Sequence, residues 1–490
     1  MRKRFEHQIE LGQTPIERVV LPLKSRDELP PVLAGLQWIF RTPEINQAVF
    51  ELLEKKVIGD KQGHTGRPGM DLWHILVLGV VRLGLDCDYD RIEHIANHDS
   101  LVRQIMGLPQ FAVDQKASFH HRTISENICH VDEALLAQIN AIVVRHGQPL
   151  LKKSAGEKLE IKTDSYVLET NVHYPTDANL LWDAARKSID ILTRLCGGHG
   201  VSGWRKAASW KKQIKIAKRI CEKAAASGGA HKSERVQTTA RAYLDAAGAL
   251  EEKINTSIII LRGKPLTLLQ RLRLEEADYF HTHLIRHMDL LERRLIRGET
   301  IPHEEKVFSL FEEHTELIRK GKVMPPVEFG HRLLISTEQH GLIVDYKVMG
   351  RGSETAEVVP NADRLLQRFE KGSIQSISYD KGFSSAGDRE LLELYIPEVI
   401  MPKKGRKSEA DEQRETTKRW KKLRDRHSAV ESNINSLEHH GLGRCLDKGL
   451  PGYERSVGFG VLAYNLHKIG AKLLEKAARQ RQQPPRQRAA

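Results

Sequence analysis

The sequence predicts an α/β fold: a mixed β-sheet flanked by helices, preceded by an all-α region and interrupted by a large helical insertion. Three observations predict it. Residues from about 26 to 147 repeat apolar side chains at three- and four-residue spacing, which is typical of amphipathic helices. β-Rich, alternating segments begin near residue 158 and resume near residue 331. The stretch between them is rich in Ala, Leu, Lys, Arg and Glu, which favours helix.

The N-terminal region, residues 1–150, is predicted to be a helical domain. Its segments include PEINQAVFELLEKKV and MDLWHILVLGVVRLGL, and Pro, Gly and Asp separate one segment from the next. The longest apolar run begins at His74, but Arg82 interrupts it and it is too short to cross a bilayer. The charged N-terminus lacks the apolar core of a signal peptide. We therefore expect a cytoplasmic protein with no membrane segment.

The predicted sheet is assembled from separate parts of the chain. Its first strand, KLEIKTDSYVLET, belongs to a first part of the core over residues 151–184. Residues 185–325 form the helical insertion, and residues 326–475 supply the remainder of the core. That remainder reads as a hairpin whose loop ends at Gly341, followed by alternating helices and strands. The tail, residues 476–490, is basic and contains prolines, so we expect it to be disordered.

Three acids stand out as candidates for chemistry. Asp380 ends a strand that looks half-buried, where an unpaired charge is unfavourable unless water or a cation reaches it. Asp164 lies in the first β segment, and Glu431 lies beside the apolar stripe of a helix. If these carboxylates converge, they form an all-oxygen site of the kind that Mg²⁺ prefers. Two such ions would suit an in-line phosphoryl displacement.

Simpler interpretations exist for each acid, because a chain with 64 Asp and Glu residues offers many triples. Asp164 could solubilise a strand edge, Asp380 could begin an Asx-turn before Gly382, and Glu431 could be an ordinary helix-face acid. Three other acids compete for the first position: Asp177, Asp183 and Asp345. An N-cap is the simpler role for Asp177.

The charge balance points to a polyanionic partner. Lys and Arg number 77 against 64 Asp and Glu, which gives a net charge of +13. Two basic stretches are candidate DNA contacts: Lys403, Lys404, Arg406 and Lys407 after the last predicted strand, and Arg205, Lys206, Lys211, Lys212 and Lys215 beside Trp204 and Trp210. The tryptophans could stack on bases, although packing into a helical core is the simpler expectation. Phosphate contacts of this kind weaken with added salt.

Three sequence blocks carry a resemblance to a known family. They are TDSYVLETNVHYPTDANLLWDAARK, SYDKGFSS, and VESNINSLEHHGLGRC followed by GFGVLAYNLHKIG. They resemble the blocks of bacterial insertion-sequence transposases of the DDE class, most closely the ISNCY group. The resemblance implies an RNase H-like catalytic core in which Asp164, Asp380 and Glu431 are the first, second and third acids. The long interval between Asp164 and Asp380 leaves room for the helical insertion.

One departure from the family pattern concerns DNA contacts. Related transposases with a Y-R-E-K helix carry Arg four residues before the Glu and Lys seven residues after it. This chain has His427 and Glu438 at those positions. The basic residues expected to take their place are Arg424, Arg426 and Arg444.

The resemblance implies a DNA transposase that binds the terminal inverted repeats of an insertion sequence. It would use two Mg²⁺ or Mn²⁺ ions, without a nucleotide cofactor, to hydrolyse double-stranded DNA to a 3′-OH and to join that end to target DNA. A dimer or larger assembly is implied, in the bacterial cytoplasm near the nucleoid. Residues 1–150 would bind DNA or mediate dimerisation, and residues 92–108 are a hypothetical helix-turn-helix.

Two other functions remain open from the sequence. One is an RNase H-like, metal-dependent nuclease without strand transfer, and the other is a catalytically inactive DNA-binding protein derived from a transposase. The adjacent His120 and His121 invite a metal interpretation, but no further ligand stands at a useful spacing, so a structural or surface role is the simpler expectation.

Overall fold

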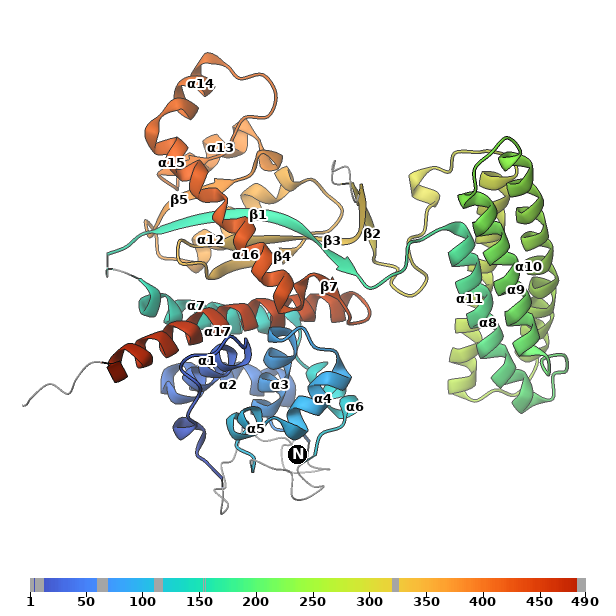
Figure 1. The fold of residues 1–490 in the computed structure, drawn as a ribbon, viewed down its shortest axis with the longest axis horizontal. Helices are drawn as coiled ribbons and strands as arrows, with labels where there is room; N and C mark the ends of the chain where they lie inside the picture. The colour runs from blue at the N-terminus through green and yellow to red at the C-terminus, as the bar shows by residue number, and fades with distance from the viewer. Residues whose placement is uncertain are drawn as a thin grey trace, which may run out of the picture. The chain divides into compact units, whose positions relative to one another are not determined.

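The structure is a computed structural model that describes residue 4 and residues 13–59, 69–109, 118–152, 154, 156–319 and 326–482. The chain forms two compact units. One comprises Met1–Asn171 together with Ile318–Ala490, and the other is Val172–Leu317. The first unit contains a seven-stranded mixed sheet flanked by helices, which confirms the predicted α/β class for the described part of the chain (Figure 1).

The long strand β1 (Leu159–Thr170) lies at the centre of this sheet (Figure 1). It pairs antiparallel with β3 (Val327–Thr337) and parallel with β5 (Ile374–Tyr379). The predicted hairpin is β3 with β4 (Ile343–Val348), and β6 (Glu398–Ile400) extends the sheet parallel to β5. Two short strands that the sequence did not indicate complete it, β2 (Glu316–Arg319) and β7 (Arg444–Cys445).

Each face of the sheet is covered by a different set of helices. On one face, apolar residues of β1 and β5 pack with α12 (Val358–Arg368) and α13 (Ala386–Glu393). On the other face, β1 and β3 pack with α16 (Ala429–Leu437) and α17 (Leu450–Gln482). Because side chains alternate along a strand, this arrangement decides which helix each strand residue faces. Two further helices precede α16, namely α14 (Glu409–Thr416) and α15 (Lys418–His427).

The N-terminal helices pack onto the C-terminal helix. They are α1 (Leu29–Arg41), α2 (Pro43–Leu53), α3 (Leu72–Gly84), α4 (Tyr89–His98), α5 (Ser100–Ile105), α6 (His121–Ile128) and α7 (Glu133–Leu151). α17 contacts α1, α3 and α7 and also β4, so it lies between these helices and the sheet (Figure 1). A buried pair adds to the packing, because Arg82 donates to both carboxylate oxygens of Asp447 at 3.0 and 2.6 Å.

The second unit is a helical body with its own core. It contains α8 (Asp177–His199), α9 (Ala207–Ala226), α10 (Lys232–Arg262) and α11 (Leu268–Leu295). Buried residues of all four helices form one apolar cluster that includes Ile189, Ile214, Tyr243 and Leu284. The unit begins 13 residues before residue 185 and ends 8 residues before residue 325, the limits expected for the insertion.

The structure differs from two expectations, the helix-turn-helix at residues 92–108 and the disordered tail. The hypothetical helix-turn-helix corresponds to α4 and α5, but only Asp99 separates them, and it caps α5 by accepting from Leu101 N and Val102 N. A helix-turn-helix needs a turn of three or four residues. The tail expected to be disordered is helical as far as Gln482, since Ala, Lys, Arg and Gln favour continuation of α17. Its residues 483–490 lie outside the described part.

A candidate carboxylate site

Asp164 and Asp380 lie side by side on the sheet. In the parallel register of β1 and β5, Thr163 is opposite Tyr379, so the next residue of each segment is one of the two acids. Asp164 is half-buried within β1, and Asp380 is exposed where β5 has just ended. Both carboxylates belong to the side-chain series that faces α15 and α16, because their strand neighbours Thr163 and Tyr379 face α12.

Glu431 lies in the first turn of α16, which packs against β1. Val430 and Leu437 hold this helix to the sheet, since both are buried in a cluster with Tyr166 and Leu168. Asn433 adds a polar anchor by donating to Thr337 Oγ1 at 3.2 Å and accepting from Tyr464 OH at 2.9 Å. Glu431 itself is exposed.

The electrostatics of Asp164 link the three acids. Burial raises the pKa of Asp164 from its ordinary value of 3.8 to about 7. The negative charges of Asp380, Glu354 and Glu431 push the pKa in the same direction, while the Ser165 N–H, which donates to Asp164 Oδ1 at 2.7 Å, opposes them. The three predicted acids and Glu354 therefore share one electrostatic environment, in which Arg332 lies 4.0 Å from the Glu354 carboxylate.

Glu354 is a fourth acid that sequence reasoning missed. It lies in η5 (Glu354–Glu357) and accepts a hydrogen bond from Ser165 Oγ at 2.7 Å. It also lies against the turn after Asp380, because a Cβ on Gly382 would come within 2.2 Å of Glu354 Oε2. No motif or spacing in the sequence distinguishes Glu354 from other surface acids. Only the return of the chain from β4 brings it to the site.

His427 is the second residue whose role the sequence did not indicate. It ends α15, and its Nδ1 lies 2.9 Å from Ser378 Oγ. Its Nε2 is buried without a hydrogen-bond partner. Burial lowers the pKa of His427 to about 4, although the nearby Asp380 charge opposes this shift. The imidazole is therefore neutral at physiological pH, and does not supply the positive charge of the Arg that the family pattern has there.

A buried polar network fixes the backbone beneath the acids. Asn361 of α12 accepts from Tyr379 OH at 3.0 Å and donates to Ser336 Oγ at 2.9 Å. Thr163 Oγ1 lies 2.7 Å from the same Ser336 hydroxyl. Asn361 also donates to Asp345, at 3.1 Å. Because Thr163 and Tyr379 directly precede Asp164 and Asp380, this network sets the positions of both acids.

The three competing acids have structural partners. Asp345 is buried and pairs with Arg364 at 2.9 Å and Arg368 at 3.3 Å. Asp183 is buried in the second unit and pairs with His173 and Arg186. Asp177 follows the N-cap, which is Thr176, and pairs with Arg294 at 3.1 Å. These ion pairs occupy carboxylates that would otherwise be available to a metal.

Two groups of three side chains in the described ranges bring one metal-ligating atom each within 4.8 Å of one another. They are Glu28 with His440 and His467, and Glu93 with His120 and His121. Asp164, Asp380 and Glu431 are in neither group, so their oxygens share an electrostatic environment without being gathered at ligand spacing. For His120 and His121 the structure supplies a neighbour, Glu93, that their sequence spacing did not reveal.

Some of the predicted DNA-binding residues form ion pairs with acids, and the others are described by their exposure. Five pair with acids: Lys407 with Glu415, Arg424 with Asp425, Arg426 with Glu160, Arg444 with Glu169, and Lys211 with Asp190. The others lie on exposed or half-buried surface: Lys403, Lys404, Arg406, Arg205, Lys206, Lys212 and Lys215. Trp204 is buried and donates to Ser257 Oγ at 3.0 Å, so it packs into the helical core. Trp210 is half-buried beside it.

A cavity of about 660 Å³ opens beside α16. Lys162, Arg426, Ser428 and Ser432 contribute to its lining, together with Glu160. Arg426 pairs with Glu160 at 2.6 Å across it. A phosphate entering this cavity would compete with Glu160 for the guanidinium group.

Among the described residues, no helix is long and apolar enough to cross a membrane. Comparison of the chain with protein-family models, with curated proteins and with solved structures finds no match.

Proposed function

We propose that this chain is a DNA transposase of the DDE class with an RNase H-like core. The observation that carries the proposal is the placement of three acids: Asp164 and Asp380 follow paired residues of two parallel strands, and the helix that carries Glu431 packs against β1. Burial raises the pKa of Asp164, and the charges of Asp380 and Glu431 raise it further. The sheet order β4-β3-β1-β5-β6, antiparallel on one side of β1 and parallel on the other, supports the fold that the resemblance implies.

The residues at this site fit divalent metal ions. Carboxylate oxygens are the ligands that Mg²⁺ and Mn²⁺ prefer. Burial is the main cause of the raised pKa of Asp164, and the neighbouring carboxylates add to it; a bound cation would favour the ionised carboxylate. Asp164, Asp380 and Glu431 would hold the ions, and Glu354 would hold the hydroxyl of the neighbouring Ser165, from which it accepts a hydrogen bond. When bound, two such ions would activate the attacking oxygen and stabilise the leaving oxygen of a phosphodiester.

The protein itself would position the reacting DNA groups and neutralise the negative charge of the phosphates. In the first reaction, water attacks the phosphorus at the element end, and the 3′ oxygen leaves as a hydroxyl. In the second, that hydroxyl attacks a phosphorus of target DNA and displaces another 3′ oxygen. The exposed cations after β6, on α15 and on α9 would contact DNA phosphates. Because two element ends must be held together, we propose a dimer or larger assembly.

Cleavage and joining assays test this function. Purified full-length protein should nick and join DNA that carries the sequences flanking its gene, when Mg²⁺ or Mn²⁺ is present. Asp380→Asn should abolish both reactions, because an amide is a much poorer metal ligand than a carboxylate. Asp363→Asn is the matched control, since it alters an exposed carboxylate of α12 outside the site.

The assay separates the alternatives. Nicked products without joined products would favour a nuclease that lacks strand transfer. Salt-dependent DNA binding without metal-dependent cleavage would favour an inactive DNA-binding protein. Strand transfer that persists in Asp380→Asn would overturn the role of Asp380.

A further inference from the structure

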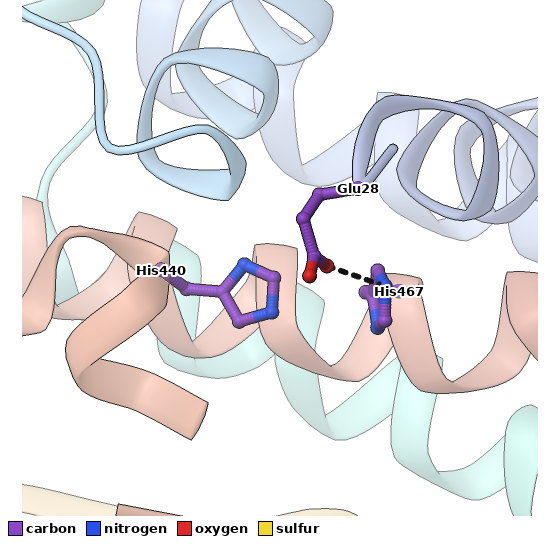
Figure 2. A group of neighbouring side chains, drawn as sticks. All are labelled: Glu28, His440 and His467. Carbon is purple, nitrogen blue, oxygen red and sulfur yellow. Dashed lines mark ion pairs between the residues drawn. The ribbon is translucent and has the colours of Figure 1, made fainter. Parts of the chain in front are cut away.

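A second group of metal-ligating side chains is separate from the acids Asp164, Asp380 and Glu431. Glu28 precedes α1, His440 lies in the π-helical turn η7 (Glu438–Leu442), and His467 lies in α17. Figure 2 shows the Glu28 carboxylate between the two imidazole rings. One ligand atom from each residue lies within 4.8 Å of the others, and the ring centroids are 5.1 Å apart.

His440 is held in the form that a metal requires. Its ring is buried, and its Nδ1 lies 3.0 Å from the carbonyl oxygen of Gly84. Because a carbonyl can only accept, Nδ1 carries the proton, and Nε2 is left with its lone pair. Metal-ligating histidines show this pattern, in which the second ring nitrogen donates to a backbone carbonyl and fixes the tautomer and ring orientation.

His467 and Glu28 form a close pair that a metal could replace. His467 Nε2 lies 2.8 Å from Glu28 Oε2 (Figure 2). Burial lowers the pKa of His467 to about 4, and His440 and Lys468 add to this effect against the Glu28 charge. Burial also lowers the pKa of His440. Histidine binds a metal through its neutral imidazole.

Glu28 is available as a ligand. It occupies the N-cap position of α1, but its side chain makes no capping hydrogen bond to the helix. The carboxylate instead turns toward His467, and more than half of the side chain stays exposed. The group thus combines two buried or half-buried nitrogens with one oxygen that reaches solvent.

We propose that Glu28, His440 and His467 form a binding site for a transition-metal dication of the Zn²⁺ class. The two-nitrogen, one-oxygen donor set suits Zn²⁺, whereas Mg²⁺ and Ca²⁺ prefer oxygen ligands throughout. Three protein ligands leave a fourth position for water on the exposed side, beside Glu28. This site does not depend on the proposed transposase function.

The ion would join three parts of the first unit that are distant in sequence. It would tie the start of α1 to α17 and to the turn that follows α16, the helix that carries Glu431. The chain leaves helical geometry at that turn, with φ −100° and ψ 42° at His440 and φ 72° at Gly441. Since the unfolded chain does not preform these ligands, metal binding would stabilise the folded state.

The other group, Glu93 with His120 and His121, is less suited to this role. His120 Nδ1 accepts from the N–H of Arg122 at 3.3 Å, and the two histidines are adjacent in sequence with their rings 4.1 Å apart. His121 lies against two acids, Glu93 and Asp90. We use this group as the comparison site in the test.

Metal binding by the full-length protein tests the proposal. Protein stripped with a chelator is titrated with Zn²⁺ and, separately, with Co²⁺, whose visible absorption reports the number and geometry of its ligands. The binding variants are Glu28→Gln, His467→Gln and the double variant, while buried His440 is left intact. The controls are His439→Gln, an exposed neighbour, and His121→Gln in the comparison site.

We expect wild type and both controls to bind one Zn²⁺ that raises the melting temperature. Each binding variant should bind this ion at least roughly tenfold more weakly, and the double variant should lose the melting shift. Metal-free variants should show the circular dichroism and melting of metal-free wild type, which shows that they fold. Wild-type protein without stoichiometric Zn²⁺ binding would overturn the proposal. Binding that survives the double variant, or that is lost in His121→Gln, would also overturn it.

Discussion

Asp164 is the residue whose chemistry is most sensitive to the rest of the site. Its side chain is half-buried in β1, and this burial raises its pKa; the carboxylates of Asp380, Glu354 and Glu431 raise it further. A carboxyl group that titrates near neutral pH is typical of functional sites, because a structure selected only for stability would pair or expose it. Asp345 shows the contrast, since two arginines compensate its buried charge.

The raised pKa of Asp164 predicts an unusual dependence of stability on pH. Between the ordinary value of 3.8 and about 7, the folded state holds a proton that the unfolded state has lost. The free energy of unfolding therefore falls as pH rises through this window, by up to about 4 kcal/mol. Asp164→Asn should remove this slope and be more stable than wild type at pH 8. Urea unfolding from pH 4 to pH 8 without added metal measures both effects.

The control for this experiment is Asp363→Asn, which should keep the wild-type slope because Asp363 is exposed on α12. An equal slope in wild type and Asp164→Asn would mean that Asp164 is ionised throughout the range. The conclusion that the acids share one electrostatic environment would then be wrong.

At the scale of single residues, the sequence predicted the parts of the site that carry a pattern. Asp164, Asp380 and Glu431 stand in the sequence blocks that carry the resemblance, and Asp164 lies in the first strand, as expected. Glu354 could not be predicted, because its place depends on where the chain returns after β4. The same holds for the partner of His427, since nothing local links it to Ser378.

At the scale of elements, the crossing of α1 and α17 depends on a close backbone approach. A Cβ at Gly470 would lie 1.9 Å from the carbonyl oxygen of Pro31 and 2.8 Å from Gly35 N. Backbone atoms at such distances cannot move aside as a flexible side chain can. The glycine is therefore required by packing, and the apolar periodicity of α17 alone gives no sign of it.

Gly470→Ala should push α1 and α17 apart and lower the free energy of unfolding by about 1–3 kcal/mol. The matched control is Gly387→Ala in α13, where nothing lies within 4 Å of the added methyl group. This control should be neutral or stabilising by about 0.5–1 kcal/mol, because alanine favours helix over glycine. Denaturant unfolding of the two variants and wild type measures the difference. Equal stabilities would show that the two helices do not approach as described.

At the scale of the whole molecule, the two units differ in whether they are continuous in the sequence. The core of the second unit comes from one continuous segment, whereas the first unit joins residues from both ends of the sequence. Composition and periodicity predicted the helical insertion because its helices and its core come from one continuous segment of the chain. They could not predict that residues 1–150 pack with α17, since the pairing of Arg82 with Asp447 spans most of the chain.

This difference predicts how fragments behave. Residues 172–317 expressed alone should be helical and unfold cooperatively, because their apolar cluster is complete within the fragment. Residues 1–150 alone should not, because α17 covers apolar side chains of α1, α3 and α7, and its removal exposes them. Circular dichroism melting and gel filtration of the two fragments check this. A cooperative, monomeric fragment 1–150 would contradict the described packing.

The central claim is that Asp164, Asp380 and Glu431 hold the same metal ions. Anomalous diffraction from crystals of the full-length protein with DNA and Mn²⁺ tests it most directly. We predict one or two Mn²⁺ ions in contact with these three carboxylates, at about 2.2 Å from their oxygens. Mn²⁺ found only elsewhere, with the three carboxylates still apart in the presence of bound DNA, would contradict the claim.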